Sequence, residues 1–156
     1  MKHTTFTHLG KNSDIASSPD EAKLERFEND AGDILVPFLC NEFTSICPVT
    51  GQPDFAKIEI LYIPEKYGVE SKSLKLYLMS YRNHGAFHES VTAQIFTDLW
   101  KFLQPKFLRV WSDFSVRGGI SIKPILLKWK EKIRSEEKGI IKEMIENYDR
   151  LRYFDR

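Results

Sequence analysis

A side chain that could act as a nucleophile and one that could transfer a proton lie close together, in one predicted loop. Cys47 is followed by Pro48 in a context that opens a loop, so its thiol is expected to be partly accessible and near backbone N–H groups that favour the thiolate. Asp54 lies beyond a Gly-Gln-Pro turn, which can return its carboxyl to the thiol as a proton donor or acceptor. A turn-capping role for Asp54 stays open. Cys40 lies in an apolar stretch and is expected to be buried and structural.

Further polar side chains mark the starts of two predicted helices. His88 and Glu89 begin the second helix, where a carboxylate is favoured by the helix dipole and could also present two acceptor oxygens to N–H donors of a ligand. Lys72 and Lys75 lie at the start of the first helix and can share a face that meets a phosphorylated ligand. For both pairs the simpler alternatives, a helix cap and a solvated basic helix start, stay open.

Composition and missing motifs exclude several classes of function. The net charge of +1 gives no sign of a polyanionic partner, so no direct contact with nucleic acid is expected. No stretch approaches the ~18 apolar residues of a membrane span, residues 1–5 lack the apolar run of a secretory signal, and two cysteines favour a reducing compartment. We therefore expect a cytoplasmic protein with no membrane association. The sequence has no Gly-rich dinucleotide or P-loop motif and no zinc-ligand spacing, so no metal site is predicted.

Hydrophobic periodicity predicts the strands that must position these residues. A β-leaning run over residues 33–43 is interrupted by its proline, and residues 43–55 are predicted to form a structured loop. Strict alternation at the start of residues 56–63 predicts a strand. Two further short strands are predicted over residues 107–111 and 119–122.

Three helices are predicted around these strands. The first has one apolar face and ends at Gly85, a residue suited to a left-handed cap; that face consists of Leu74, Tyr77, Leu78 and Tyr81. The second extends from about His88 to Pro105, and the third, amphipathic and rich in Lys and Glu, extends from about residue 128 onward.

The order of these elements indicates an α+β protein. A chain of 156 residues is about one domain long. We expect a mobile N-terminal segment over residues 1–20, a catalytic domain over residues 21–127 and a C-terminal helical extension over residues 128–156.

Taken together, these segments resemble the NADPH-dependent 7-cyano-7-deazaguanine reductases, enzymes of queuosine biosynthesis. The similarity extends over about residues 24–122 and is most specific in the cysteine loop and in the Glu-Ser-Lys-Ser segment. The segments that carry it are residues 43–55 (Phe-Thr-Ser-Ile-Cys-Pro-Val-Thr-Gly-Gln-Pro-Asp-Phe), 70–77 (Glu-Ser-Lys-Ser-Leu-Lys-Leu-Tyr), 80–83 (Ser-Tyr-Arg-Asn), 87–89 (Phe-His-Glu) and 117–120 (Arg-Gly-Gly-Ile).

The resemblance implies the tunnelling fold, an antiparallel β-sheet with two helices packed on one face, shared with GTP cyclohydrolase I. It also implies homo-oligomeric rings with active sites at subunit interfaces. The chain looks like the short, single-domain form of the family. The residues from about 128 onward have no counterpart in it and are expected to add a C-terminal helix.

The implied chemistry is the reduction of 7-cyano-7-deazaguanine to its aminomethyl form with two NADPH. By resemblance, Cys47 adds to the nitrile to form a covalent thioimide, and Asp54 donates the proton to the nitrile nitrogen. Glu89 would hold the guanine-like N–H edge. The other implied substrate contacts are Val69, Glu70, Ser71 and His88. The implied cofactor contacts are Lys72, Lys75, Arg82 and Arg117.

Two alternatives are weighed against this function. A zinc-dependent relative that processes pterins or GTP on the same fold would need two cysteines and a histidine as ligands, a pattern that Cys40 and Cys47 do not offer. A non-catalytic purine-binding module would not need Cys47 and Asp54, which are both present.

Overall fold

The computed structural model describes residue 7 and residues 14–154, with the side chains of residues 153 and 154 left out. The expected mobile segment over residues 1–20 lies largely outside the described residues. The elements in chain order are η1 (Pro19–Glu21), β1 (Arg26–Glu28), β2 (Val36–Ile46), β3 (Pro53–Ile63), β4 (Tyr67–Val69), α1 (Ser71–Met79), η2 (Ser80–Asn83), α2 (His88–Leu103), β5 (Phe107–Phe114), β6 (Ile125–Trp129) and α3 (Ser135–Phe154).

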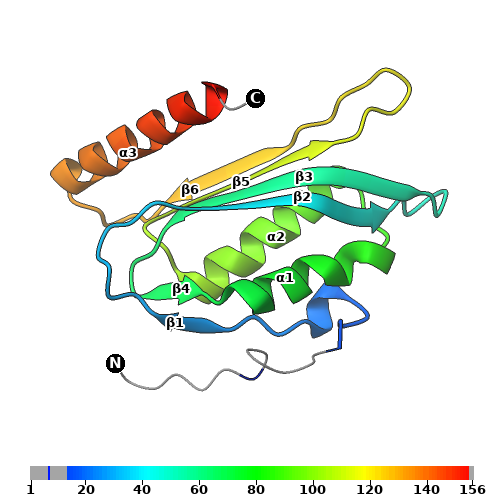
Figure 1. The fold of residues 1–156 in the computed structure, drawn as a ribbon, viewed down its shortest axis with the longest axis horizontal. Coiled ribbons are helices and arrows are strands. Elements are labelled where there is room, and N and C mark those ends of the chain that lie inside the picture. Colours follow the sequence, from blue (N-terminus) through cyan, green and yellow to red (C-terminus); the bar gives the residue numbers. More distant parts are fainter. Residues whose placement is uncertain (1–6, 8–13, 155–156) are drawn as a thin grey trace.

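A four-stranded antiparallel sheet forms the centre of the molecule, in the order β2-β3-β5-β6. Helices α1 and α2 cover one face of this sheet, and α3 lies across the other face (Figure 1). Strands β1 and β4 form a separate antiparallel pair beside the start of α1. The predicted α+β class, with an antiparallel sheet, two helices on one face and an added C-terminal helix, is confirmed.

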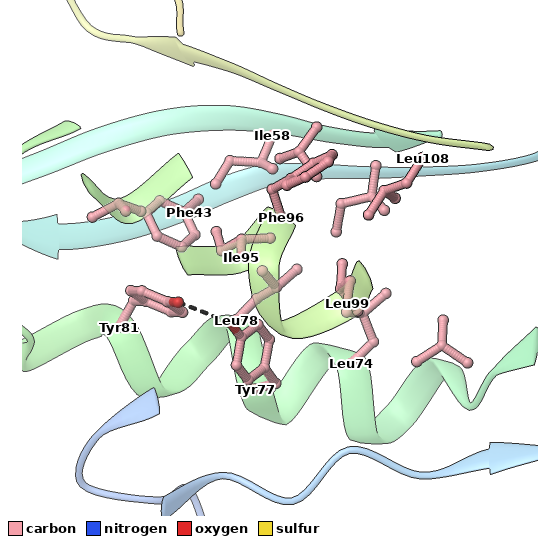
Figure 2. Packing of buried hydrophobic residues seen from close by; sticks show 14 of the residues in the cluster. Phe43, Ile58, Leu74, Tyr77, Leu78, Tyr81, Ile95, Phe96, Leu99 and Leu108 are labelled. Carbon is pink, nitrogen blue, oxygen red and sulfur yellow. Dashed lines mark hydrogen bonds between the residues drawn. The ribbon is translucent and has the colours of Figure 1, made fainter. Parts of the chain in front are cut away.

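The main core lies between the sheet and the α1–α2 layer. Strand β3 sends Ile58 and Ile60 toward the helices, which meet them with the apolar faces that the periodicity predicted (Figure 2). On the helix side this layer consists of Leu74, Tyr77, Leu78, Tyr81, Val91, Ile95 and Leu99. Strand β3 is buried on both faces, because Leu61 and Ile63 point to the opposite side and pack against α3.

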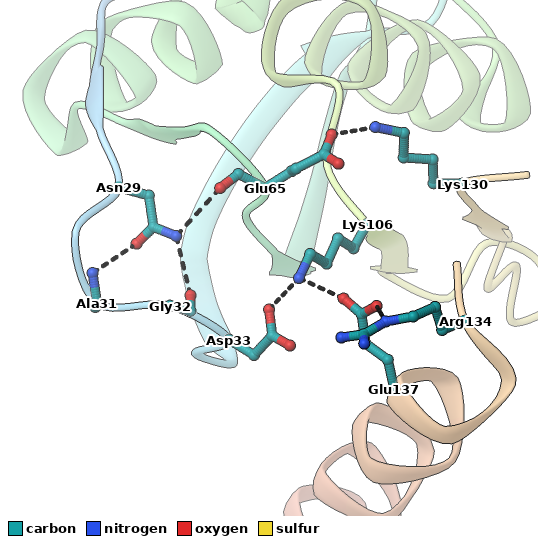
Figure 3. A network of polar contacts seen from close by, with 9 residues as sticks. All are labelled: Asn29, Ala31, Gly32, Asp33, Glu65, Lys106, Lys130, Arg134 and Glu137. Carbon is teal, nitrogen blue, oxygen red and sulfur yellow. Dashed lines mark hydrogen bonds and ion pairs between the residues drawn. The ribbon is translucent and has the colours of Figure 1, made fainter. Parts of the chain in front are cut away.

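Helix α3 is attached by a small apolar cluster and by ion pairs. Ile141 and Ile145 pack on the outer face of β3 and β5. Lys106, which precedes β5, bonds both Asp33 and Glu137 at the base of α3 (Figure 3). Apolar packing therefore holds the middle of α3 on the sheet, and ion pairs hold its start.

Four predicted boundaries are wrong, and strand pairing or a glycine turn explains each difference. Strand β2 passes through Pro37, which pairs with Leu61; β2 is an edge strand, where a missing N–H is tolerated. The loop predicted over residues 43–55 is limited to residues 47–52, because β2 and β3 stay paired on either side of it.

The other two errors lie after β5. The predicted strand over residues 119–122 is a turn closed by a bridge between Arg117 and Ile120, and the last strand is β6 instead. Since β6 contains Lys128, the boundary expected there falls inside the sheet, and the C-terminal helix begins only at Ser135.

Candidate active site

Cys47 is the first residue after β2, in the hairpin that connects β2 to β3. Its N–H donates to the Gln52 carbonyl at 2.8 Å, and its carbonyl accepts from the Gly51 N–H at 2.9 Å. Gly51 has φ of +69°, a conformation that favours glycine and allows the chain to turn back into β3. The hairpin backbone therefore fixes the position of the thiol.

The surroundings of Cys47 favour its thiolate. Hydrogen bonds lower the pKa of this thiol to about 6, first from the Thr50 hydroxyl, then from the Thr50 and Val49 N–H groups and from Arg117. At neutral pH the sulfur is a nucleophile.

Cys40 and Cys47 are both half-buried, but they differ in their surroundings and in the pKa of the thiol. It lies within β2 against the main core, and burial raises the pKa of its thiol. Along an extended strand of about 3.3 Å per residue the two cysteines are roughly 20 Å apart, well beyond the reach of a disulfide within one chain. The structural role predicted for Cys40 agrees with this placement.

Asp54 is a buried carboxylate at the start of β3, with only 4% of its surface exposed. Strand register places it directly opposite Ser45, whose buried hydroxyl has no hydrogen-bond partner among the described residues. One carboxylate oxygen, Oδ1, lies 3.1 Å from Nε2 of His88 and also forms an ion pair with Arg117. Asp54 is thus bonded to two side chains from distant segments, and it is not a simple turn cap.

His88 is held rigidly at the start of α2. Its ring stacks on Phe114 at the end of β5, with centroids 3.9 Å apart and planes within 6°. The chain before α2 is joined to β2, because the Ile46 N–H donates to the His84 carbonyl and the Ala86 N–H donates to the Ile46 carbonyl, both at 3.2 Å. These contacts bring His88 to Asp54, a proximity that the sequence spacing does not reveal.

Glu89 is exposed in the first turn of α2, next to this cluster. The structure therefore brings together five of the predicted residues at one end of the sheet: Cys47, Asp54, His88, Glu89 and Arg117. It adds Thr50 and Phe114, which sequence reasoning missed. Thr50-Gly51 is typical of a turn, so the place of Thr50 beside Cys47 could have been predicted. No local pattern could have indicated the stacking of Phe114 on His88.

A second group of predicted residues lies at the other end of α1. Val69 is buried at the end of β4, and Glu70 accepts hydrogen bonds from the N–H groups of Lys72 (2.8 Å) and Ser73 (2.7 Å), which caps α1. Ser71 is the first residue of that helix. Helix α1 and η2 separate this group from the cysteine hairpin by roughly 20 Å at about 1.5 Å per residue (Figure 1).

The four predicted cofactor residues do not lie together. Lys75 and Arg82 line a cleft of about 290 Å³ between β2 and α1, which Ser71, a predicted substrate contact, also lines. The floor of this cleft includes Leu74 and Leu78. Lys72 is half-buried in the first turn of α1 and does not line this cleft. Arg117 is elsewhere, bonded to Asp54 at the cysteine hairpin.

Among residue 7 and residues 14–154, no cluster of three His, Cys, Asp or Glu side chains is arranged to hold a metal ion. Within the same part of the chain, no helix is both long and apolar enough to cross a membrane.

An antiparallel α+β domain with an activated thiol beside a buried carboxylate and histidine defines a class of cysteine-dependent enzymes.

Comparison with known proteins identifies the family. The family model described as QueF-like protein matches residues 53–133. The chain is also similar to proteins named NADPH-dependent 7-cyano-7-deazaguanine reductase from several bacteria. It therefore belongs to the family of these reductases, as the sequence motifs predicted.

The similarity to these reductases covers about two thirds to three quarters of this chain. Identity to the Streptococcus mutans relative is 59% over 103 residues, 65% of this chain and 64% of that protein. For Porphyromonas gingivalis the identity is 53% over 118 residues, 74% of this chain and 77% of the relative. For Helicobacter pylori it is 57% over 105 residues, 66% of this chain and 71% of the relative. The alignment with the Streptococcus mutans protein thus spans just under two thirds of its length.

A solved structure supports the fold. The apo form of the archaeosine synthase QueF-Like superposes with a TM-score of 0.57 at 19% identity, covering 63% of this chain and 96% of the other. At this identity the likeness shows the fold alone, and it agrees with the tunnelling type that the motifs implied.

Proposed function

We propose that this chain reduces the nitrile of 7-cyano-7-deazaguanine to the aminomethyl group, with two NADPH per product, as a cytoplasmic step of queuosine biosynthesis. The observation that carries the proposal is the thiol of Cys47, with its pKa lowered to about 6, in the same cluster as the buried pair Asp54–His88. The names of the similar proteins supply the substrate and the reductant.

In the first step, Cys47 acts as the nucleophile, and the buried pair Asp54–His88 handles the proton. The Cys47 sulfur attacks the nitrile carbon, one C–N π bond breaks, and the electron pair moves to nitrogen to give a thioimide. The proton lost from the Cys47 thiol is relayed by Asp54 to this nitrogen, so that the step as a whole adds S–H across one C–N π bond. His88 and Arg117 keep the Asp54 carboxylate oriented through their bonds to Oδ1. NADPH, when bound, supplies the hydride for each of the two reductions. The Cys47 sulfur would leave as the thiolate between the two reductions, so the nucleophile is regenerated.

Substrate recognition is assigned to both groups of polar residues. Glu89 is exposed and offers two acceptor oxygens, which match adjacent N–H donors on a guanine-like ring. His88 lines the same site with its stacked ring. Val69, Glu70 and Ser71 would supply further contacts. Because they lie at the far end of α1, they reach a substrate on Cys47 only from a second copy of the chain.

This separation supports a homo-oligomer with sites between subunits. Strands β2 and β6 are free edges of the sheet in the described part of the chain, and both expose apolar side chains. Those side chains are Leu39, Ile125 and Leu127, each more than half exposed. Pairing of such edges between copies would extend the sheet and close a ring.

The residues expected to hold NADPH fit a phosphorylated, partly apolar molecule. Lys75 and Arg82 place two cations at the cleft between β2 and α1, and the leucines there supply an apolar floor. Lys72 lies one turn away on the same helix. We assign the phosphates to these three residues. Arg117 would join them only by leaving Asp54.

The test is a spectrophotometric assay of NADPH oxidation with the nitrile, combined with mass spectrometry. We expect two NADPH consumed per product and, without NADPH, a mass adduct of the nitrile on Cys47. The Cys40→Ser variant is the matched control and should form the adduct normally. If Cys47→Ala reduced the nitrile at the wild-type rate, or if no adduct formed on the wild-type protein, the proposal would be wrong.

A further inference from the structure

Arg117 is presented by a tight turn in the long connection between β5 and β6. Arg117 and Ile120 exchange backbone hydrogen bonds at 3.1 and 2.9 Å around Gly118 and Gly119, whose φ values of +55° and +83° suit only glycine well. The connection is also joined to β3, since the Ser115 N–H donates to the Phe55 carbonyl at 2.9 Å. Backbone bonds therefore set the position from which the Arg117 side chain extends.

The guanidinium of Arg117 acts on two groups of the site. It forms an ion pair with Oδ1 of Asp54, and its positive charge near the hairpin contributes to the lowered pKa of the Cys47 thiol. The side chain is 41% exposed, while that of Asp54 is only 3% exposed. One cation thus lies between a buried carboxylate from β3 and a thiolate from the hairpin.

We propose that Arg117 is a positioning residue that joins the Cys47 sulfur to the Asp54 carboxylate before the substrate binds. This role differs from the cofactor contact that family resemblance implies. It deepens the proposed function, and it rests on that function for the roles of Cys47 as nucleophile and Asp54 as proton donor. Without the guanidinium, two anions would face each other in one site, and the carboxylate would disfavour ionisation of the thiol.

The charged groups that bond within the cluster come from separate elements. Among the described residues, those bonded within the cluster are Asp54 from β3, His88 from α2 and Arg117 from the connection after β5. Lys123, in the same connection, pairs instead with Asp113 at 3.1 Å. It offers a matched control, because its loss removes one positive charge from this connection without touching the cluster.

The experiment measures alkylation of Cys47 by iodoacetamide between about pH 4.5 and pH 9.5 in the full chain, with the modified residue identified by peptide mass. We expect an inflection near pH 6 for wild type. In Arg117→Gln it should rise by about one pH unit, which lowers the rate at pH 6 about fivefold and leaves the rate near pH 9.5 unchanged. Arg117→Lys, which keeps the charge, should recover much of the loss, and Lys123→Gln should match wild type.

Three results would overturn the inference. These are an Arg117→Gln inflection equal to that of wild type, an Arg117→Lys profile equal to that of Arg117→Gln, and an equal shift in Lys123→Gln. Because alkylation needs neither the nitrile nor NADPH, its outcome is separable from the reductase assay. A normal pH shift in a protein without nitrile reduction would contradict the proposed function and leave the role of Arg117 standing.

Discussion

At the scale of single residues, the reactivity of Cys47 depends most on Thr50. The Thr50 oxygen accepts the Gln52 N–H at 3.3 Å, which leaves its own hydrogen available to the sulfur. The hydrogen bond from the Thr50 hydroxyl to the Cys47 sulfur has the largest of the effects that lower the pKa of the thiol. The thiolate therefore predominates above about pH 6 and is lost as the pH falls through that value.

Replacing Thr50 by valine should raise the pKa of Cys47, because the methyl group cannot donate to the sulfur. We expect the inflection in the alkylation rate to move up by about one pH unit. Near pH 9.5, where the thiol ionises in both proteins, the rates should converge. Thr50→Ser keeps the hydroxyl and should titrate like wild type. Equal inflections in the valine and serine variants would show that the hydroxyl has no part in activating the thiol.

The candidate site could be predicted from the sequence where its residues are neighbours along the chain. Cys47 and Asp54 flank a short turn, so their proximity follows from the hairpin. The contacts of Asp54 with His88 and Arg117 depend on packing between β3, α2 and the connection after β5, and no local pattern encodes them. The motif could indicate that Arg117 matters, but not that it bonds the carboxylate.

At the scale of elements, helices could be predicted better than strands. Apolar residues recur in α1 and α2 with a period of 3.6 residues, because each helix buries one side against the sheet. Residues 119–122 alternate like a strand, yet two glycines with positive φ turn the chain there. Strand β6 could not be predicted because Lys128 makes its sequence look like part of the charged segment that follows. Its strand conformation also depends on pairing with β5, which no local pattern reveals.

The attachment of α3 depends on a buried charge network. Glu59 in β3 is 1% exposed and bonds Arg109, Tyr148 and Arg152. Arg109 also binds Asp149 through two bonds of 2.8 and 2.6 Å. Such a network connects the outer face of the sheet to the last turns of α3.

Glu59→Gln should destabilise the protein, because it leaves buried cations without a full counter-charge. We expect a loss of about 3 kcal/mol in the free energy of unfolding, measured by urea denaturation. Glu65→Gln is the control, since Glu65 pairs with Lys130 at the surface and both are about 40% exposed. The loss there should be below about 1 kcal/mol. Similar losses in the two variants would show that the network does not hold α3 more firmly than a surface pair.

At the scale of the whole molecule, the two halves of the proposed site lie at opposite ends of α1. Cys47, Asp54, His88 and Glu89 belong to one half, and the residues around Ser71 belong to the other. A single chain cannot bring both halves to one substrate without unfolding its core helices. The assignment of both halves to one reaction therefore requires that copies of the chain share each site.

Mixing two inactive variants tests this sharing. Cys47→Ala removes the nucleophile, and Ser71→Trp should block the second half sterically, at an exposed position where the helix tolerates a larger side chain. Refolded as a random mixture, about a quarter of head-to-tail interfaces would combine an intact cysteine with an intact Ser71. We expect NADPH oxidation to recover to about this fraction of wild type. Each variant refolded alone should stay inactive, and a mixture no more active than its parts would mean that each chain holds a complete site.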